Sequence, residues 1–347
     1  MPDDIFTKSY IADSLTVKSH LTGLQPGSAD LQKLMSDCTL CPRNCHANRI
    51  AGEKGFCGQT AELVAARAAL HMWEEPCISG THGSGTVFFS GCNLKCVFCQ
   101  NHSIANGRNG HQISGNHLAE IFLHLQEQGA HNINLVTPTH FVPQICLALQ
   151  SAKEQGLTIP IVYNTGSYEH VDTLKLLEGL VDIYLPDLKY YDSLIARDYS
   201  NAGDYFDRAS LAIAEMFRQT GPACFDTTDK AMSKNGPVST QQNFEESMMK
   251  RGIIVRHLLL PGQTKDSKKI LRYLHNTYGN DIYISIMSQY TPLPHVANIP
   301  ALNRKVTLEE YQRVIEFALK IGIENGFFQE GEAANESFIP EFDGLGL

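Results

Sequence analysis

The sequence of 347 residues has little positive charge. Lys and Arg total 28 against 37 Asp and Glu, the formal net charge is −9, and no basic run is longer than Ser-Lys-Lys at residues 267–269. Proteins that bind nucleic acid through its phosphates need clustered basic charge. The composition therefore argues against nucleic acid as the main partner.

Long apolar runs are also missing. No segment approaches the roughly 18 uncharged apolar residues that a membrane-spanning helix needs. The first ten residues, MPDDIFTKSY, are acidic and polar and do not resemble a signal peptide. We therefore expect a cytoplasmic protein that has no membrane partner.

Cysteine, in contrast, is abundant. The chain has ten cysteines, and eight of them lie between Cys38 and Cys99. The cytoplasm keeps thiols reduced, so disulfide bonds are not expected there. Metal binding is the simplest explanation of the crowding. The remaining two, Cys146 and Cys224, stand in apolar or mixed stretches and are predicted to be buried packing residues.

The middle of the chain alternates between strand and helix patterns. Six short apolar runs predict strands, at residues 86–90, 132–137, 160–165, 181–189, 252–262 and 281–287. Stretches with helical spacing predict helices between them, at residues 117–129, 141–156, 168–179, 208–221 and 266–279. This order indicates βα repeats around a parallel sheet. The preferred fold is α/β, a partial (β/α)6 TIM-like barrel, and a flat doubly wound sheet is the alternative.

The predicted barrel is flanked by two other segments. Residues 1–80 contain a leader to about residue 35 and a small Cys-rich metal-binding segment, residues 81–300 form the barrel, and residues 301–347 form a C-terminal helix and tail. Thr307 and Glu310 predict a capping box for that helix. Its apolar face is expected to contain Leu308, Tyr311, Ile315 and Ala318. The polar stretch 226–247 is predicted to be an inserted surface loop.

The stretch FFSGCNLKCVFCQN holds three cysteines, Cys92, Cys96 and Cys99, directly after the first predicted strand. Structural zinc sites and common iron–sulfur clusters usually take four protein ligands. Three thiolates therefore suggest a metal centre with one position open for a substrate or cofactor. His102 offers an alternative, because it is placed to be the fourth ligand of a zinc knuckle. In a barrel of parallel strands, chemistry gathers at the carboxyl ends of the strands, and these cysteines stand at such an end.

The spacing C-x3-C-x2-C after a first strand, followed by βα repeats, resembles the radical S-adenosylmethionine (SAM) superfamily. More closely, the chain resembles the branch related to pyruvate formate-lyase activating enzyme that carries an N-terminal cysteine segment. The resemblance covers most of the chain. The segments that carry it are CTLCPRNCHANRIAGEKGFCG, EEPCISGTHGSGTVFFSGCNLKCVFCQN, NLVTPTH, DIYLPDLKYYD, RHLLLPG and ISIMSQYTPLP.

The resemblance implies a cofactor and an activity. Cys92, Cys96 and Cys99 would hold a [4Fe-4S] cluster whose fourth iron is left for SAM. Reductive cleavage of SAM would give a 5′-deoxyadenosyl radical that abstracts hydrogen. The target would be a backbone glycine of a glycyl-radical enzyme, and the electron donor a flavodoxin or ferredoxin.

Two other functions stay open at this point. One is a radical SAM enzyme that acts on another peptide, a metabolite or a nucleotide. The other is a non-catalytic, metal-stapled or electron-transfer protein. Cleavage of SAM separates the non-catalytic protein from the two enzymes.

Polar residues in the predicted strands are candidates for holding SAM. Arg256 lies in an otherwise apolar strand and needs a partner, which the carboxylate of SAM or an internal acid can supply. Asp187 and Lys189 face the same side of a strand, and the resemblance implies that they contact SAM or a cation beside it. A structural ion pair is the alternative. Asn164 can bond the ribose or the amino group, or cap the following turn. Phe98 either packs on the adenine or belongs to the core.

One stretch departs from the superfamily pattern. Many members place Gly-Gly-Glu after the second strand to bind the amino group of SAM, whereas this chain has VTPTH there. Hydroxyl groups and backbone carbonyls around Thr137, Thr139 and His140 would have to replace the missing acid. Thr139 is alternatively the N-cap of the following helix.

A second cysteine set precedes the first. Cys38, Cys41, Cys45 and Cys57 have the spacing C-x2-C-x3-C-x11-C. Four thiolates in a short segment can close a zinc site or hold an auxiliary iron–sulfur cluster. The sequence does not separate these two readings, and Cys77 is close enough in the chain to replace one of the four.

Overall fold

The computed structural model describes residues 29–226, 247–328 and 340–347. Residues 1–28 of the predicted leader and residues 227–246 of the predicted insertion lie outside these ranges. No helix in the described ranges is long and apolar enough to cross a membrane.

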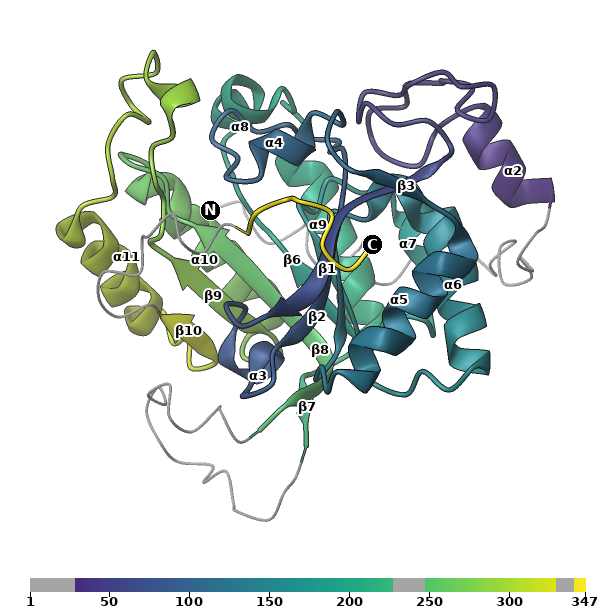
Figure 1. Ribbon diagram of the computed structural model, residues 1–347. Coiled ribbons are helices and arrows are strands. Elements are labelled where there is room, and N and C mark those ends of the chain that lie inside the picture. Colours follow the sequence, from purple (N-terminus) through teal and green to yellow (C-terminus); the bar gives the residue numbers. More distant parts are fainter. Residues whose placement is uncertain (1–28, 227–246, 329–339) are drawn as a thin grey trace, which may run out of the picture.

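The described residues form strands and helices in alternation (Figure 1). The strands are β1 (Leu63–His71), β2 (Ser84–Phe89), β3 (His111–Ile113), β4 (Ile133–Val136), β5 (Ile161–Thr165), β6 (Ile183–Pro186), β7 (Cys224–Phe225), β8 (Met249–Leu258), β9 (Tyr283–Met287) and β10 (Gly326–Phe328). The α-helices are α2 (Ala29–Ser36), α3 (Pro76–Ser79), α4 (His102–Ala105), α5 (Gly115–Glu127), α6 (Val142–Glu154), α7 (Val171–Lys175), α8 (Ser193–Ser200), α9 (Tyr205–Thr220), α10 (Thr264–Tyr278) and α11 (Leu308–Lys320). Two 3-10 turns are η1 (Thr139–Phe141) and η3 (Pro294–Val296).

The strand order decides between the two predicted architectures. Neighbouring strands follow the order β10-β9-β8-β6-β5-β4-β2-β1-β3, and the strands from β2 to β10 in this path pair in parallel. A doubly wound sheet would reverse its order at a switch point. A strictly sequential order with right-handed crossovers puts the helices on one face, so the sheet curls. The fold is therefore a partial TIM-like barrel, as predicted, and its sheet is not closed within the described residues.

Residues on the two faces of the curled sheet have different surroundings, because side chains alternate along a strand. The outward residues pack against the crossover helices, and they include Val87, Leu135, Tyr163, Tyr184, Val255 and Ile284. The inward residues near the start of the strands form a smaller apolar cluster with α3, and they include Val162, Ile183, Leu185, Ile254 and Tyr283. Helix α3 thus fills the floor of the barrel, and the space above that floor is polar.

Several elements differ from the prediction. Strands β1, β3 and β10 extend the predicted sheet at its edges, and β1 comes from the segment before residue 80. The predicted helix 168–179 is reduced to α7. The capping box at Thr307 and Glu310 is confirmed.

Tyr311 and Ala318 are buried in the apolar face of α11, as predicted, but two other predictions of buried residues are wrong. Leu308 is 70% exposed, because the first residue of α11 points to solvent and Val314 takes its place in the buried face. Cys224 is exposed, since β7 is a two-residue strand paired only to β8. Cys146 is buried, as predicted.

Candidate active site

The first cysteine set lies on the loop that follows β2. Cys92, Cys96 and Cys99 are each partly buried. The loop turns sharply at Gly91, with φ of 91°, and at Lys95, with φ of 52°. A Cβ atom on Gly91 would lie 2.7 Å from the carbonyl oxygen of Cys57, so only glycine fits there.

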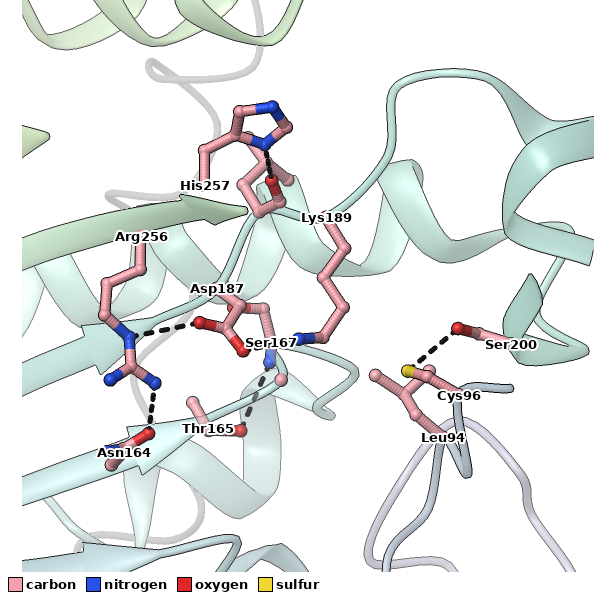
Figure 2. A network of polar contacts seen from close by, with 12 residues as sticks. Leu94, Cys96, Asn164, Thr165, Ser167, Asp187, Lys189, Ser200, Arg256 and His257 are labelled. Atoms are coloured by element: carbon pink, nitrogen blue, oxygen red, sulfur yellow. Dashed lines mark hydrogen bonds and ion pairs between the residues drawn. The ribbon is translucent and has the colours of Figure 1, made fainter. Parts of the chain in front are cut away.

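Hydrogen-bond donors already point at two of the three sulfurs. The backbone N–H of Leu94 donates to Cys92 Sγ at 3.4 Å, and the hydroxyl of Ser200 donates to Cys96 Sγ at 3.0 Å. Figure 2 shows the Ser200 contact and the side chain of Lys189, whose nitrogen is directed at Asp187. Such donors stabilise a sulfur that carries negative charge.

The electrostatics of these thiols depend on burial and on one cation. Burial and the neighbouring Cys96 sulfur raise the pKa of Cys92 and Cys99, whereas Lys189 lowers it. Without a metal the thiols of Cys92 and Cys99 are therefore protonated at neutral pH. A metal centre would displace these protons, because only the thiolate is a good ligand.

Next to the cysteine loop is a network of charged side chains at the ends of β6 and β8 (Figure 2). Lys189 Nζ lies 2.5 Å from Asp187 Oδ2, and Arg256 Nε donates to Asp187 Oδ1 at 3.1 Å. Arg256 Nη2 donates to Asn164 Oδ1 at 2.5 Å. The fold thus brings together four of the residues that the sequence singles out: Asn164, Asp187, Lys189 and Arg256.

The network also contains two acids, Glu74 and Glu75, that the sequence does not predict to lie there. Glu74 reaches up from the loop between β1 and α3, and its Oε2 lies 3.2 Å from Arg256 Nη1. Asn134 Nδ2 donates to Glu74 Oε1 at 3.0 Å. Glu75 is buried beside it and close enough to Arg256 to interact with it electrostatically. The only signal for these residues is a Glu-Glu pair before Pro76, which does not identify a partner 182 residues away.

The charges in the network determine its protonation. Burial alone would raise the pKa of Asp187, but Lys189 and Arg256 together lower it below the ordinary value. For Glu74 and Glu75, burial dominates and raises the pKa, although Arg256 opposes this effect. Asp187 is therefore ionised at neutral pH. The internal ion pair that was the alternative for Arg256 is present, and so is that for Asp187 and Lys189.

Two buried acceptors in this region lack a hydrogen-bond partner among the described residues. They are Glu75 Oε2 and Asn134 Oδ1. Buried polar atoms normally have hydrogen-bond partners, so a buried acceptor without one indicates a missing ligand or water. A polar ligand with hydroxyl or ammonium donors would supply the missing partners.

The other residues predicted to hold SAM have different surroundings. Phe98 is buried and packs edge-on against Tyr190, Tyr199 and Tyr290, so it belongs to the core. Thr137 has φ of 58°, which is strained for a β-branched residue. It stands at the end of β4, where strain is typical of functional sites.

Thr139 is not the N-cap of the following helix. Helix α6 begins after Phe141, and the Thr139 hydroxyl donates instead to Glu169 Oε1 at 2.6 Å. Glu169 is buried, and burial raises its pKa to about 7. Thr165 and Tyr163 also donate to the same carboxylate oxygen. This cluster lies on the outward side of the sheet, together with the outward residue Tyr163.

The second cysteine set lies above the carboxyl ends of the strands. Cys38 and Cys57 are buried, Cys41 is partly buried and Cys45 is exposed. Burial raises the pKa of Cys41 to about 12. Gln144 and Thr173 anchor this segment to the barrel by donating to the carbonyl groups of Ala61 and Leu40.

In the ranges that the structure describes, no group of three or more His, Cys, Asp and Glu side chains is arranged to hold a single metal ion. His102, the fourth ligand of the zinc-knuckle alternative, is exposed and its ring packs against that of His295. The described residues thus give no support to the zinc knuckle.

Comparison with known proteins gives the family. The model of the radical SAM superfamily matches residues 86–274. The chain belongs to the radical SAM superfamily. Enzymes of this superfamily carry out radical chemistry with a [4Fe-4S] cluster and SAM, so this chain is such an enzyme.

The individual proteins to which the chain is similar share less than a third of their residues with it. The chain is 29% identical over 322 residues to the uncharacterized protein MJ0674 of Methanocaldococcus jannaschii, with 89% of this chain and 81% of that protein covered. Among solved structures it is similar to SuiB of Streptococcus suis bound to SAM, with 13% identity, 70% of this chain covered and a TM-score of 0.45. It is also similar to the FeFe-hydrogenase maturase HydG of Carboxydothermus hydrogenoformans, with 11% identity, 73% covered and a TM-score of 0.41. The chain spans 49% of that SuiB chain and 59% of that HydG chain.

The residues of the radical SAM site fit the cofactors of the superfamily. Three thiols with hydrogen-bond donors aimed at two of them and a cation nearby suit a cluster with one open position. The polar space beside them carries both signs of charge and two unsatisfied acceptors. A zwitterionic methionine group needs charges of both signs.

Proposed function

We propose that this protein cleaves SAM reductively at a [4Fe-4S] cluster held by Cys92, Cys96 and Cys99, and that the resulting radical abstracts hydrogen from a substrate. The observation that carries the proposal is the position of these thiols beside the charged network of Asp187, Lys189 and Arg256. When bound, the cluster supplies the electron that cleaves the sulfonium and yields the 5′-deoxyadenosyl radical.

The chain's own residues bind and orient in this proposal. Asn164, Asp187, Lys189 and Arg256 hold the methionine end of SAM, because they supply both charges at the carboxyl ends of neighbouring strands. Glu74 fixes Arg256 from below. Thr137, whose backbone is strained, stands at the place where the superfamily has Gly-Gly-Glu, and its hydroxyl and backbone carbonyl are the groups that would accept from the amino group of SAM. The apolar floor formed with α3 excludes water from the bottom of the barrel.

A comparison of two cysteine variants tests the proposal. The protein is reconstituted anaerobically with iron and sulfide, reduced and mixed with SAM, and 5′-deoxyadenosine is quantified. Cys92→Ser should reduce the product to background, because a hydroxyl does not replace the thiolate ligand. Cys224→Ser, a change at an exposed cysteine on β7, should leave the product at the wild-type level. Product formation by Cys92→Ser at the wild-type rate would overturn the assignment.

For the substrate, we propose a backbone glycine of a glycyl-radical enzyme. The support is the resemblance to the branch related to pyruvate formate-lyase activating enzyme. The electron donor would be a flavodoxin or ferredoxin. The test mixes the reduced enzyme and SAM with a glycyl-radical enzyme of the pyruvate formate-lyase type and records an electron paramagnetic resonance (EPR) spectrum. A glycyl radical on the partner supports the proposal, and 5′-deoxyadenosine without that radical favours another peptide, a metabolite or a nucleotide.

A further inference from the structure

We propose that Cys38, Cys41, Cys45 and Cys57 hold a second [4Fe-4S] cluster and not a zinc ion. This inference goes beyond the radical SAM site and concerns a segment before the residues that the superfamily model matches. It depends on three features of the structure: a glycine beside two of the sulfurs, a buried cation without a carboxylate partner, and the arrangement of the four thiols.

Gly55 keeps space open beside two of the sulfurs. A Cβ atom on this residue would lie 3.0 Å from Cys45 Sγ and 3.5 Å from Cys57 Sγ. The backbone of Gly55 is not in the left-handed region that favours glycine, unlike that of Gly52 or Gly58. The glycine is therefore explained by room next to the sulfurs and not by the backbone. A metal cluster bound to the sulfurs of Cys45 and Cys57 would occupy the space that Gly55 leaves open beside them.

Arg49 is a buried cation aimed at the same cysteines. The residue is 1% exposed, and its Nη1 lies 3.9 Å from Cys38 Sγ. Its other contacts are the carbonyl oxygens of Thr60 and His140, the sulfur of Met35 and the ring of Phe141, whose centroid lies 5.7 Å from the guanidinium carbon. In the described residues no carboxylate pairs with it. Because a buried guanidinium is costly without negative charge nearby, the site must supply that charge. A centre held by four thiolates carries net negative charge and would supply it.

The arrangement of the thiols favours a cluster over a zinc ion. With Zn–S bonds of about 2.3 Å, a tetrahedral zinc site draws its four sulfurs to within about 4 Å of each other. In the part of the chain that the structure describes, no three His, Cys, Asp or Glu side chains are placed to hold a single metal ion. A [4Fe-4S] cluster takes each thiolate at a different iron, so its sulfurs are spread around it. All four ligands are cysteines, which also suits such a cluster.

The segment is locked against the radical SAM loop. The guanidinium of Arg43, between Cys41 and Cys45, donates to the carbonyl of Asn93 at 2.7 Å and to that of Ser200 at 2.9 Å. Asn93 follows Cys92, and the Ser200 hydroxyl donates to Cys96. On the other side, the carbonyl of Cys57 packs against Gly91. The second cluster would therefore lie directly beside the loop of the first.

The first test removes the radical SAM cysteines. The variant with Cys92, Cys96 and Cys99 all changed to Ala is reconstituted anaerobically beside the wild type, and iron, sulfide and zinc are counted per chain. We expect about eight irons in the wild type and about four in the variant, with an EPR signal after reduction. About four irons in the wild type and none in the variant, with or without one zinc per chain, would overturn the inference while leaving the radical SAM assignment intact. If the variant instead kept all the iron of the wild type, the proposed ligands of the first cluster would be wrong.

A second variant covers the case in which the triple variant does not fold. Gly55→Val places a side chain against the Cys45 and Cys57 sulfurs and should lower the iron count from about eight to about four. Gly115→Val is the matched control, because Gly115 has an ordinary φ and a Cβ atom there meets nothing within 4 Å. Its iron count should match that of the wild type. If the two variants bound equal numbers of irons per chain, the space beside Gly55 would not be needed for the second cluster, which would contradict the proposal.

Discussion

Arg256 is part of a buried ion-pair network and is also one of the residues that we propose to bind SAM. Its guanidinium stands in an apolar strand at 14% exposure of its side chain and pairs with Asp187 and Glu74. An isolated buried charge would be too costly, so each member of the network depends on the others. The sequence predicts the need for a partner at Arg256 but not the identity of Glu74.

We predict that Arg256→Met lowers the free energy of unfolding by about 3 kcal/mol, because it leaves the carboxylates of Asp187 and Glu74 short of a cation. Arg313→Met is the control, since Arg313 pairs with Glu309 on the exposed face of α11 and such pairs are worth about 0.5 kcal/mol or less. Urea unfolding of the metal-free chain measures both. Similar losses in the two variants would contradict the view that Arg256 is central to a buried network.

At the residue scale, the sequence predicts the cysteines better than the acids. The spacing of Cys92, Cys96 and Cys99 fixes their role because a short loop after a strand must bring them together. Glu74 and Glu169 could not be found in this way. Arg256 is 182 residues from Glu74 and Thr139 is 30 residues from Glu169, and only the fold brings the members of each pair into contact.

The elements of the fold were predicted where apolar periodicity is strong. The six central strands were found from sequence because both faces of each strand are buried. Strand β1 was missed, since its sequence LVAARAALH is rich in alanine and has weak β propensity. Its pairing with β2 decides its conformation. Strands β3 and β10 have three residues each, too few to show a period.

His257 connects three of these elements from the outward face of β8. Its Nδ1 lies 2.8 Å from the carbonyl oxygen of Leu188, which follows β6, and its Nε2 lies 2.8 Å from Ser267 Oγ in α10. Burial lowers its pKa from 6.5 to about 4, although the Leu188 carbonyl and Asp187 oppose this. The folded state therefore keeps the ring neutral at pH values where the unfolded chain protonates it.

The consequence is a pH dependence of stability. Below pH 6.5 the unfolded state binds a proton that the folded state binds only near pH 4, so the contribution of His257 to stability falls as the pH is lowered. Between pH 7 and pH 5, the free energy of unfolding of the wild type should drop by about 2 kcal/mol more than that of His257→Gln. Denaturant unfolding of both metal-free chains at each pH measures this. Parallel pH profiles would contradict the buried neutral histidine.

At the scale of the whole molecule, the sequential strand order places the loop of Cys92, Cys96 and Cys99 and the polar residues Asn164, Asp187, Lys189 and Arg256 at the carboxyl ends of neighbouring strands. The count and alternation of strands in the sequence predict the barrel. The sequence does not predict that the N-terminal cysteine segment packs against the loop of Cys92, because that contact depends on hydrogen bonds from Arg43 to the backbone carbonyls of Asn93 and Ser200, which are distant in sequence. The two cysteine sets are thus neighbours in space as well as in sequence.

The central claim is that Cys92, Cys96 and Cys99 hold a cluster whose open position binds SAM. The most direct measurement is electron–nuclear double resonance on the reduced, reconstituted protein with SAM labelled at its amino nitrogen. The account predicts a magnetic coupling between that nitrogen and the cluster in the wild type, and none in the variant with Cys92, Cys96 and Cys99 changed to Ala. A reduced wild-type cluster that shows no coupling to the labelled SAM would contradict it.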